Sequence, residues 1–247
     1  MKEQIILVAG ATSAIARAAC RHFAADGARF FLVGRRTEQL QTVQQDLQAA
    51  GAPAVETMMA DMQDRTNHQA VLEACGQRLG EPDLVLVAWG LLGDQGAGEA
   101  DFAVAENSLD CNFLSVAAFL TPVANTMARR GAGTIAVITS VAGDKGRMSN
   151  YIYGAGKGAL ILWLQGLRNR LFHQGVHVVD IRPGFVDTPM TTAHKKNALF
   201  ASADQVGRGI HRAVRRRKDV VYLPFFWRGL MLIIRAMPEL VFKRLKL

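Results

Sequence analysis

Short, almost purely apolar segments alternate along this chain with longer segments of helical periodicity, and this alternation restricts the fold more than any other feature. The run DLVLVAW (83–89) has no polar residue after its first, which is typical of a strand covered on both faces. Helices between successive strands act as crossover connections and place neighbouring strands parallel. The pattern therefore predicts an α/β fold, with a doubly wound parallel sheet of about seven strands flanked by helices.

The positions of these segments give the expected elements. Strands are predicted at residues 5–8, 29–33, 54–59, 84–89, 134–139, 176–181 and 220–223. Helices are predicted near residues 14–26, 37–50, 64–79, 101–129, 150–173 and 202–217. The 247 residues contain no internal repeat, low-complexity tract or linker. We therefore expect one domain over residues 1–223 and a C-terminal extension over residues 224–247.

Composition excludes several other classes of protein. Hydrophobic residues make up 50% of the chain and charged residues 20%, which argues against disorder. Cys20, Cys75 and Cys111 are odd in number and far apart, so we expect reduced thiols and a cytoplasmic protein. The six histidines show no zinc-type grouping, so no metal site is expected. The early run IILV is too short for a signal peptide, and no segment has the about 20 uninterrupted apolar residues of a membrane-spanning helix.

The first predicted strand leads through a glycine turn into a helix, in the stretch VAGATSAIARA (8–18). In a Rossmann-like fold such a turn presents backbone N–H groups and the positive end of a helix dipole to nucleotide phosphates. Ala14 and Ala16 replace two of the usual three glycines, but alanine keeps its N–H and is harmful only where φ must be positive. The alternative is a turn that binds nothing. The residues predicted to bind are Gly10, Thr12, Ser13, Ala14 and Ile15.

A second group of residues has the spacing of a proton-transfer site. Ser140 follows a predicted strand, and Tyr153 and Lys157 lie four residues apart, on one face of the next predicted helix. A nearby ammonium lowers the phenol pKa from about 10, and such a tyrosine can donate a proton to a carbonyl oxygen that the Ser140 hydroxyl also contacts. Taken singly, these residues are typical of a helix surface or a strand-end turn. Tyr151 is a rival phenol, but the residue four positions after it is Ala155.

These residues resemble the Ser…Tyr-x-x-x-Lys set of the short-chain dehydrogenase/reductases, and the resemblance covers nearly the whole chain. It implies a fourth catalytic residue, Asn112 in LDCNFLSV, which kinks its helix and holds a water that links the lysine to solvent. Of the family's Asn-Asn-Ala-Gly motif, only Gly90 is present. The resemblance implies further cofactor contacts from Asp61, Met62, Gly90, Tyr153, Lys157, Pro183, Gly184, Val186 and Thr188.

The end of the second predicted strand, in FFLVGRRTEQL, indicates which nicotinamide cofactor is bound. NAD-dependent relatives place a carboxylate there for the ribose hydroxyls, whereas this chain has Gly34 followed by Arg35 and Arg36. Guanidinium groups hold a 2′-phosphate through charge-assisted hydrogen bonds, whereas a carboxylate would repel it. We therefore predict NADP(H). The alternative is two surface arginines on a solvated turn.

The excess positive charge lies at the end of the chain, where residues 208–247 contain 11 Lys and Arg against 2 Asp and Glu. Arg228 and Arg235 lie seven residues apart, on one face of a predicted helix. A basic amphipathic helix of this kind lies on membrane surfaces, and its dense aliphatic content favours lipid over nucleic acid. The alternative is packing across a subunit interface. The expected apolar surface comprises Phe225, Phe226, Trp227, Leu230, Met231 and Ile234.

Three stretches, GDKGRMSNYIYGAGKGAL, DIRPGFVDTPM and AMPELVFKRLKL, resemble the branch of the family that reduces decaprenylphosphoryl 2-keto-erythropentose. The resemblance implies a lipid-linked keto sugar of cell-envelope polysaccharide synthesis, an FAD-dependent oxidase partner, and a location at the inner face of the cytoplasmic membrane. It also implies a homodimer or homotetramer, and residues 188–205 are a predicted lid. Two alternatives remain: a soluble reductase of acyl, steroid or small carbonyl substrates, and a nucleotide-binding scaffold without turnover.

Overall fold

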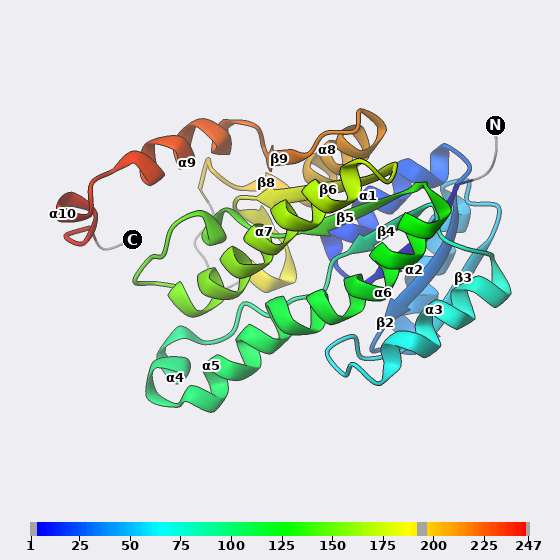
Figure 1. Ribbon diagram of the computed structural model, residues 1–247, viewed down its shortest axis with the longest axis horizontal. Coiled ribbons are helices and arrows are strands. Elements are labelled where there is room, and N and C mark those ends of the chain that lie inside the picture. Colours follow the sequence, from blue (N-terminus) through cyan, green and yellow to red (C-terminus); the bar gives the residue numbers. More distant parts are fainter. Residues whose placement is uncertain (1–3, 192–196, 246–247) are drawn as a thin grey trace.

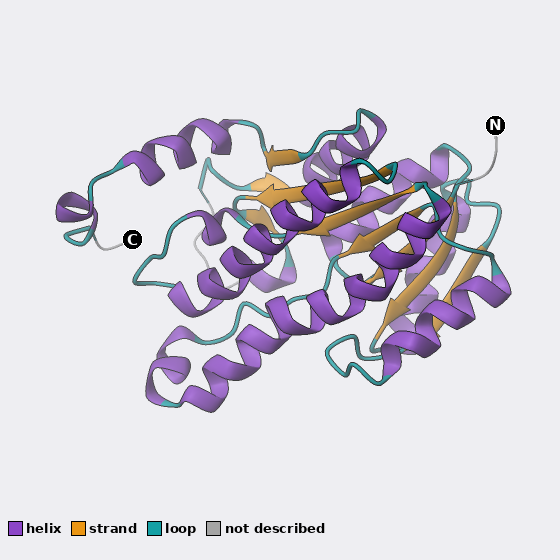
Figure 2. Cartoon of the chain, viewed as in Figure 1, coloured by secondary structure: helices purple, strands orange, loops and turns teal. Residues whose placement is uncertain are grey.

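The computed structural model describes residues 4–191 and 197–245. Its main sheet has seven parallel strands in the order β3-β2-β1-β4-β5-β6-β9, which confirms the predicted doubly wound α/β fold (Figure 1). The strands are β1 (Ile5–Ala9), β2 (Arg29–Gly34), β3 (Val55–Met59), β4 (Leu84–Val87), β5 (Gly133–Ile138), β6 (Val176–Pro183) and β9 (Val220–Leu223). Because the strands are parallel, their C-terminal ends meet at one edge of the sheet (Figure 2).

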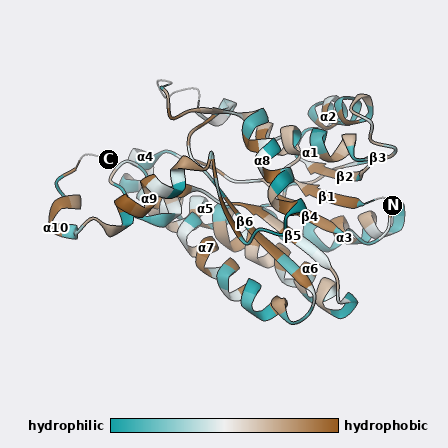
Figure 3. Ribbon diagram, turned by 90° about the horizontal axis from the view of Figure 1, so that it is seen from above, coloured by the Kyte–Doolittle hydropathy of each residue, from teal (hydrophilic) through white to brown (hydrophobic). Residues whose placement is uncertain are grey.

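Helices cover both faces of this sheet, as Figure 3 shows. One face carries α1 (Ala14–Ala25), α2 (Thr37–Ala49) and α8 (Ala203–Arg215). The other carries α3 (Asn67–Arg78), α6 (Ser115–Arg130) and α7 (Tyr151–Phe172). Five of the six helices predicted from the sequence therefore form with boundaries shifted by a few residues, and the sixth, predicted over residues 101–129, is divided.

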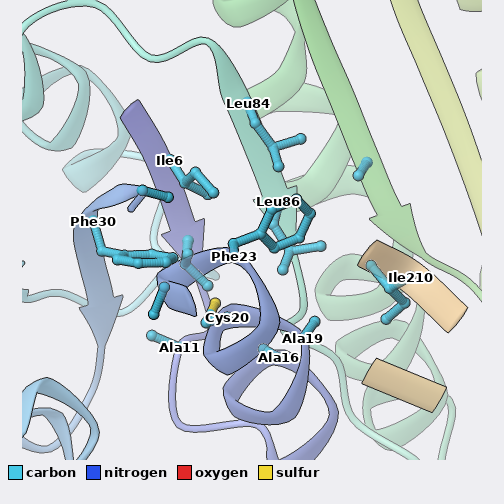
Figure 4. Packing of buried hydrophobic residues seen from close by; sticks show 14 of the residues in the cluster. Ile6, Ala11, Ala16, Ala19, Cys20, Phe23, Phe30, Leu84, Leu86 and Ile210 are labelled. Carbon is cyan, nitrogen blue, oxygen red and sulfur yellow. The ribbon is translucent and has the colours of Figure 1, made fainter. Parts of the chain in front are cut away.

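Burial on both faces explains why the strands lack polar positions. Along β1, Ile6 and Val8 face the core beneath α1, whereas Leu7 and Ala9 face the core beneath α6. Figure 4 shows the first core, in which Phe23 of α1 packs among side chains of β1, β2 and β4. Each fully buried large side chain contributes about 1.5–3 kcal/mol, so these two layers supply much of the driving force for folding.

The helix predicted over residues 101–129 is interrupted. It consists of α5 (Phe102–Leu109), one π-helical turn η1 (Asp110–Leu114), and α6. Within the described residues, the run Phe102–Arg130 is the one helix long and apolar enough to cross a membrane, and 50% of its most apolar window is buried. Phe119 and Leu120 pack against the sheet, so this run acts as a core helix.

Several short elements near the C-terminal edge of the sheet escaped the sequence analysis. They are α4 (Gln95–Ala100), the 3₁₀ turns η2 (Val141–Asp144) and η3 (Pro189–Thr191), and a ribbon of β7 (Val186–Asp187) and β8 (Ala201–Ser202). Elements of two to six residues carry too little periodicity to be recognised. The predicted lid over residues 188–205 falls partly outside the described residues, since 192–196 are not described.

The C-terminal extension forms α9 (Phe226–Ala236) and α10 (Glu239–Phe242), at the end of the molecule where the strands terminate (Figure 1). Here the predicted apolar surface is wrong in part. Trp227 and Met231 are buried in a third core with Val141, and Leu230 and Ile234 pack against it. These residues recur every three or four positions, so they share the helical face that docks on the protein.

A different set of apolar side chains on the extension is exposed. Phe225 is 74% exposed, Leu232 69% and Ile233 65%, and on α10 Leu240 is 62% exposed. Arg228 and Arg235 are exposed beside them. The extension is therefore apolar on two faces, of which the described residues cover one.

Candidate active site

A cavity of about 770 Å³ lies where the parallel strands end. Every residue predicted to bind the cofactor lines it, and so do Ser140, Tyr153 and Lys157. Asn112 lies behind the wall and contacts it through Gly90. Side chains and turns from segments far apart in the sequence therefore meet in one cavity.

The turn after β1 has the geometry of a phosphate-binding loop. Gly10 has a φ of +84°, and a Cβ there would lie 2.5 Å from the backbone nitrogen of Trp89, so this position requires glycine. Ser13 caps α1, and its Oγ accepts a hydrogen bond from the N–H of Ala16. Ala14 is the first residue of α1 and has no positive φ. The replacement of its glycine is thus sterically harmless.

The same turn leaves backbone donors free. No described residue accepts a hydrogen bond from the N–H groups of Thr12, Ala14 and Ile15. All three residues line the cavity at the positive end of the α1 dipole. Three unpaired donors at a helix N-terminus form a site for a phosphate group, so the turn fits a dinucleotide despite its missing glycines.

At the end of β2, the wall of the cavity is cationic. Arg35 and Arg36 are exposed and line the cavity, and their guanidinium groups form no hydrogen bond or ion pair with any described residue. A Cβ on Gly34 would lie 3.2 Å from Cδ2 of Leu40 and 3.4 Å from Cγ2 of Thr12. A side chain at position 34 would therefore require Leu40 to shift slightly, and the glycine found there places no negative charge beside the arginines.

Beyond β3, Asp61 and Met62 form the wall beside the arginines. Asp61 is exposed and its Oδ1 accepts a hydrogen bond from the N–H of Gln63, 3.0 Å away. Met62 is buried, and its carbonyl oxygen lies 2.9 Å from Nε2 of His68. The predicted adenine-contact residues are thus held by local hydrogen bonds.

Ser140, Tyr153 and Lys157 converge on the opposite side of the cavity. Ser140 follows β5, and its Oγ accepts a hydrogen bond from the N–H of Ala142 at 3.1 Å. A side-chain hydrogen bond from Ser140 also acts on the phenol of Tyr153 and lowers its pKa. Lys157 is buried on the face of α7 that carries Tyr153, with its Nζ 5.9 Å from the centre of the phenol ring. The same Nζ donates to the carbonyl of Ile138 at 3.2 Å. Tyr151 is exposed, and Tyr153 is the phenol that lines the cavity.

The pKa of Tyr153 is raised, whereas the sequence analysis expected the ammonium of Lys157 to lower it. Burial raises the pKa of Tyr153 to about 12, and the hydrogen bond from Ser140 offsets only part of this. Burial also lowers the pKa of Lys157 to about 8. Desolvation of each charged form thus outweighs the attraction of an ammonium 5.9 Å from the ring centre. At neutral pH the phenol keeps its proton, and Lys157 is charged in most molecules.

Asn112 occupies the π-helical turn and links it to the cavity wall. Its Nδ2 donates to the carbonyls of Leu91, at 2.7 Å, and Ser108, at 2.9 Å, and its Oδ1 accepts from the N–H of Leu91. A Cβ on Gly90 would lie 2.8 Å from Oδ1 of Asn112 and 3.2 Å from Nζ of Lys157. Gly90 therefore lets its loop approach the side chains of both Asn112 and Lys157. This close approach explains why glycine is the one position of the Asn-Asn-Ala-Gly motif that this chain retains.

A buried polar network beneath the cavity was not foreseen. Asp180 accepts hydrogen bonds from Thr139 Oγ1, at 2.6 Å, and from Arg182 Nε, at 2.8 Å. Arg182 also reaches Asp144 Oδ1 at 2.7 Å, and Tyr222 donates to Asp144 Oδ2 at 2.8 Å. The network joins β5, β6 and β9 to the turn after Ser140. The one signal in the sequence is the alternation of Asp180 and Arg182 along β6, which places them on one face.

Residues after β6 close the remaining side of the cavity. Pro183, Gly184, Val186 and Thr188 all line it. A Cβ on Gly184 would overlap the indole of Trp227, so glycine at this position lets α9 pack against the cavity wall. The extension is therefore part of the architecture around the site.

A parallel sheet with a dinucleotide-type turn and a Ser–Tyr–Lys group at its C-terminal edge defines a class of nicotinamide-dependent oxidoreductases. The family model of the short chain dehydrogenases matches residues 4–199. The chain therefore belongs to the short-chain dehydrogenase/reductase family.

Sequence relatives agree with this assignment. An uncharacterized oxidoreductase of Mycobacterium tuberculosis is 32% identical, over 97% of this chain and 96% of the relative. One of Streptomyces coelicolor is 34% identical, over 97% and 95%. Sulfoacetaldehyde reductase 2 of Chromohalobacter salexigens is 32% identical, over 76% and 74%.

Solved structures share the fold. Levodione reductase superposes with a TM-score of 0.81 at 22% identity, over 89% of this chain and 95% of the other. A single-residue variant of actinorhodin polyketide ketoreductase, solved with NADPH, has a TM-score of 0.77 at 23% identity, over 85% and 89%. At these identities the likeness concerns the fold alone.

Proposed function

We propose that this protein is an NADPH-dependent reductase of a ketone, and that the ketone belongs to a lipid-linked sugar. The observation that carries the proposal is the convergence of Ser140, Tyr153 and Lys157 on the cavity that the free amides of the α1 turn also face. A fold with only a nucleotide-binding role would have no need of a phenol, a hydroxyl and an amine at the opposite wall.

The residues present fit a dinucleotide. The free N–H groups of Thr12, Ala14 and Ile15 would hold the pyrophosphate, and Lys157 the nicotinamide ribose. When bound, the reduced dinucleotide supplies the hydride for the carbonyl carbon. Gly34 leaves room beside the adenosine ribose, and Arg35 and Arg36 supply two cations for a 2′-phosphate, which favours NADP(H) over NAD(H).

Tyr153 acts as the proton donor to the carbonyl oxygen. With a pKa of about 12, the phenol holds its proton throughout the neutral range and gives it up only when negative charge develops on the oxygen. Ser140 donates a hydrogen bond to the same oxygen, and charged Lys157 stabilises the phenolate that remains. Asn112 positions Lys157 by holding the Gly90–Leu91 loop against it.

The proposed substrate is a polyprenyl-phosphate keto pentose of cell-envelope synthesis, produced by an FAD-dependent oxidase partner. Support comes from the exposed apolar side chains of α9 and α10, which lie at the same end of the molecule as the cavity. We place the protein in the cytoplasm, peripherally bound to the inner face of the membrane through residues 224–247, as a homodimer or homotetramer. The excess of arginine and lysine in that region favours anionic lipid.

NADPH oxidation followed at 340 nm tests the proposal. We expect purified protein to oxidise NADPH in the presence of the keto-sugar lipid and to be inactive with NADH at the same concentration. Absence of turnover with either cofactor would overturn the assignment of substrate and reaction together.

A soluble ketone reductase is the second candidate, and the similarity to sulfoacetaldehyde reductase 2, named for a small carbonyl substrate, favours it. Vesicle flotation separates the two. A full-length protein that stays in the soluble fraction with anionic vesicles, and reduces small carbonyl compounds, would establish the second candidate.

A further inference from the structure

Arg147 lies in the loop between η2 and α7, at the boundary of two cavities. One is the cavity of about 770 Å³ that contains Tyr153, and the other is a smaller cavity of about 190 Å³ beneath α10. Arg147 lines both. Its side chain therefore stands between the reacting groups and the C-terminal extension.

The guanidinium of Arg147 has no counterion in the described chain. Its Nε is buried and donates no hydrogen bond, and no ion pair forms with the side chain. Asp144, the carboxylate that acts on it electrostatically, is already engaged through Oδ1 with Arg182 and through Oδ2 with Tyr222. Burial lowers the pKa of Arg147, which expresses the cost of a desolvated cation without a partner.

Among the described residues, the smaller cavity is lined by two cations, Arg147 and Lys243, and by one carboxylate, Glu239. Lys243 directly follows the end of α10, and Glu239 begins that helix. Lys145, two residues before Arg147, donates to the carbonyl of Met237 at 2.8 Å and lies 4.2 Å from the ring centre of Phe242. These contacts hold the loop against α10, so Arg147 and Lys243 line one cavity from two segments of the chain.

We propose that Arg147, assisted by Lys243, binds the phosphate of a phosphoester substrate whose ketone reaches Tyr153. This inference rests on the proposed function, because it assigns a subsite to the same substrate. A guanidinium presents paired N–H donors that match a phosphate, and in a desolvated wall the ion pair is only weakly screened. The rest of such a substrate would leave over α10, where Leu240 and Val241 are exposed.

Binding to the NADPH-saturated protein tests the subsite without turnover, so its result is independent of the proposed reaction. Saturation with NADPH occupies Arg35 and Arg36, so these two arginines cannot bind the phosphate probe in place of Arg147. The probes are methyl phosphate and octyl phosphate, measured by isothermal titration calorimetry. We expect Arg147→Gln to weaken binding of both by at least tenfold, Arg147→Lys to restore part of it, and the exposed control Arg129→Gln to bind like the unaltered protein.

The two probes distinguish the sources of the phosphate. Tighter binding of octyl phosphate supports a lipid-linked phosphoester, whereas equal binding of the two supports a soluble one. Equal binding by Arg147→Gln and the unaltered protein would overturn the subsite. So would loss of NADPH affinity in Arg147→Gln, because Arg147 would then serve the cofactor instead.

Discussion

The cofactor cavity and the C-terminal extension lie side by side but are stabilised in opposite ways. Around the cavity most buried charged groups are paired: Asp180, Arg182 and Asp144 bond to one another, and Lys157 donates to a carbonyl, whereas Arg147 is the exception. On α9 and α10, large apolar side chains such as Leu232 and Ile233 face solvent. The comparison teaches that polar pairing holds much of the cavity wall together, whereas the extension has one face packed on the protein and one apolar face exposed to solvent.

The largest expected effect concerns the chemistry of the cavity, the first of the two regions compared. Tyr153→Phe removes the proton donor and keeps the ring, so the rate of reduction should fall about 100- to 10,000-fold. NADPH affinity, measured by fluorescence titration, should change little. Substantial remaining activity would assign the proton transfer to another group, and Tyr151→Phe is the control.

Trp227→Ala tests whether the extension belongs to the folded core. The indole is 2% exposed and packs against Gly184, so its removal should lower the free energy of unfolding by about 3–5 kcal/mol. Urea unfolding measures the change. Phe225→Ala, at a side chain 74% exposed, is the control and should cost less than about 0.5 kcal/mol. Equal effects of the two changes would show that α9 does not pack as described.

Cofactor choice gives a smaller effect. Arg35→Asp should weaken NADPH binding about 10- to 100-fold, because a charge-assisted contact with a phosphate is replaced by repulsion. NADH binding should change much less. Equal losses for the two cofactors, compared by titration, would refute the assignment of Arg35 to the 2′-phosphate.

The pH dependence follows from the two shifted groups. Lys157, with a pKa of about 8, is charged at pH 7 and neutral at pH 9, whereas Tyr153 stays protonated until about pH 12. The rate of reduction should therefore be flat below about pH 7 and fall up to tenfold per pH unit above about pH 8. Initial rates under saturating NADPH measure it. A profile that stays flat to pH 10 would show that the charge of Lys157 is not required.

The smallest effect on the folded protein concerns the exposed face of α9. Leu232→Asp and Ile233→Asp together should change stability by less than about 1 kcal/mol, because both side chains are already in solvent. They should nevertheless abolish flotation with anionic vesicles. Leu162→Asp, at a leucine 70% exposed on α7, is the matched control. Unchanged flotation of the double variant would show that the exposed face of α9 does not bind the membrane, and the contrast with the cavity would then have no functional meaning.

The sequence by itself determined the layered fold and predicted which residues meet at its C-terminal edge. Strand–helix alternation identified all seven strands of the main sheet, and parallel strands necessarily bring their following turns to one edge. Ser140, Tyr153 and Lys157 were recognisable because a helix of fixed pitch places residues four apart on one face.

Only the tertiary structure decided what depends on burial and on contacts between distant segments. The side of α9 that docks on the protein was settled by the space beside Gly184, so Trp227 faces inward. The pKa of Tyr153 is raised because desolvation depends on everything packed around the phenol, which no local spacing encodes. Asp144, Arg182 and Tyr222 meet because β5, β6 and β9 are neighbours in the sheet, and both oxygens of Asp144 are then engaged, so Nε of Arg147 finds no partner among the described residues.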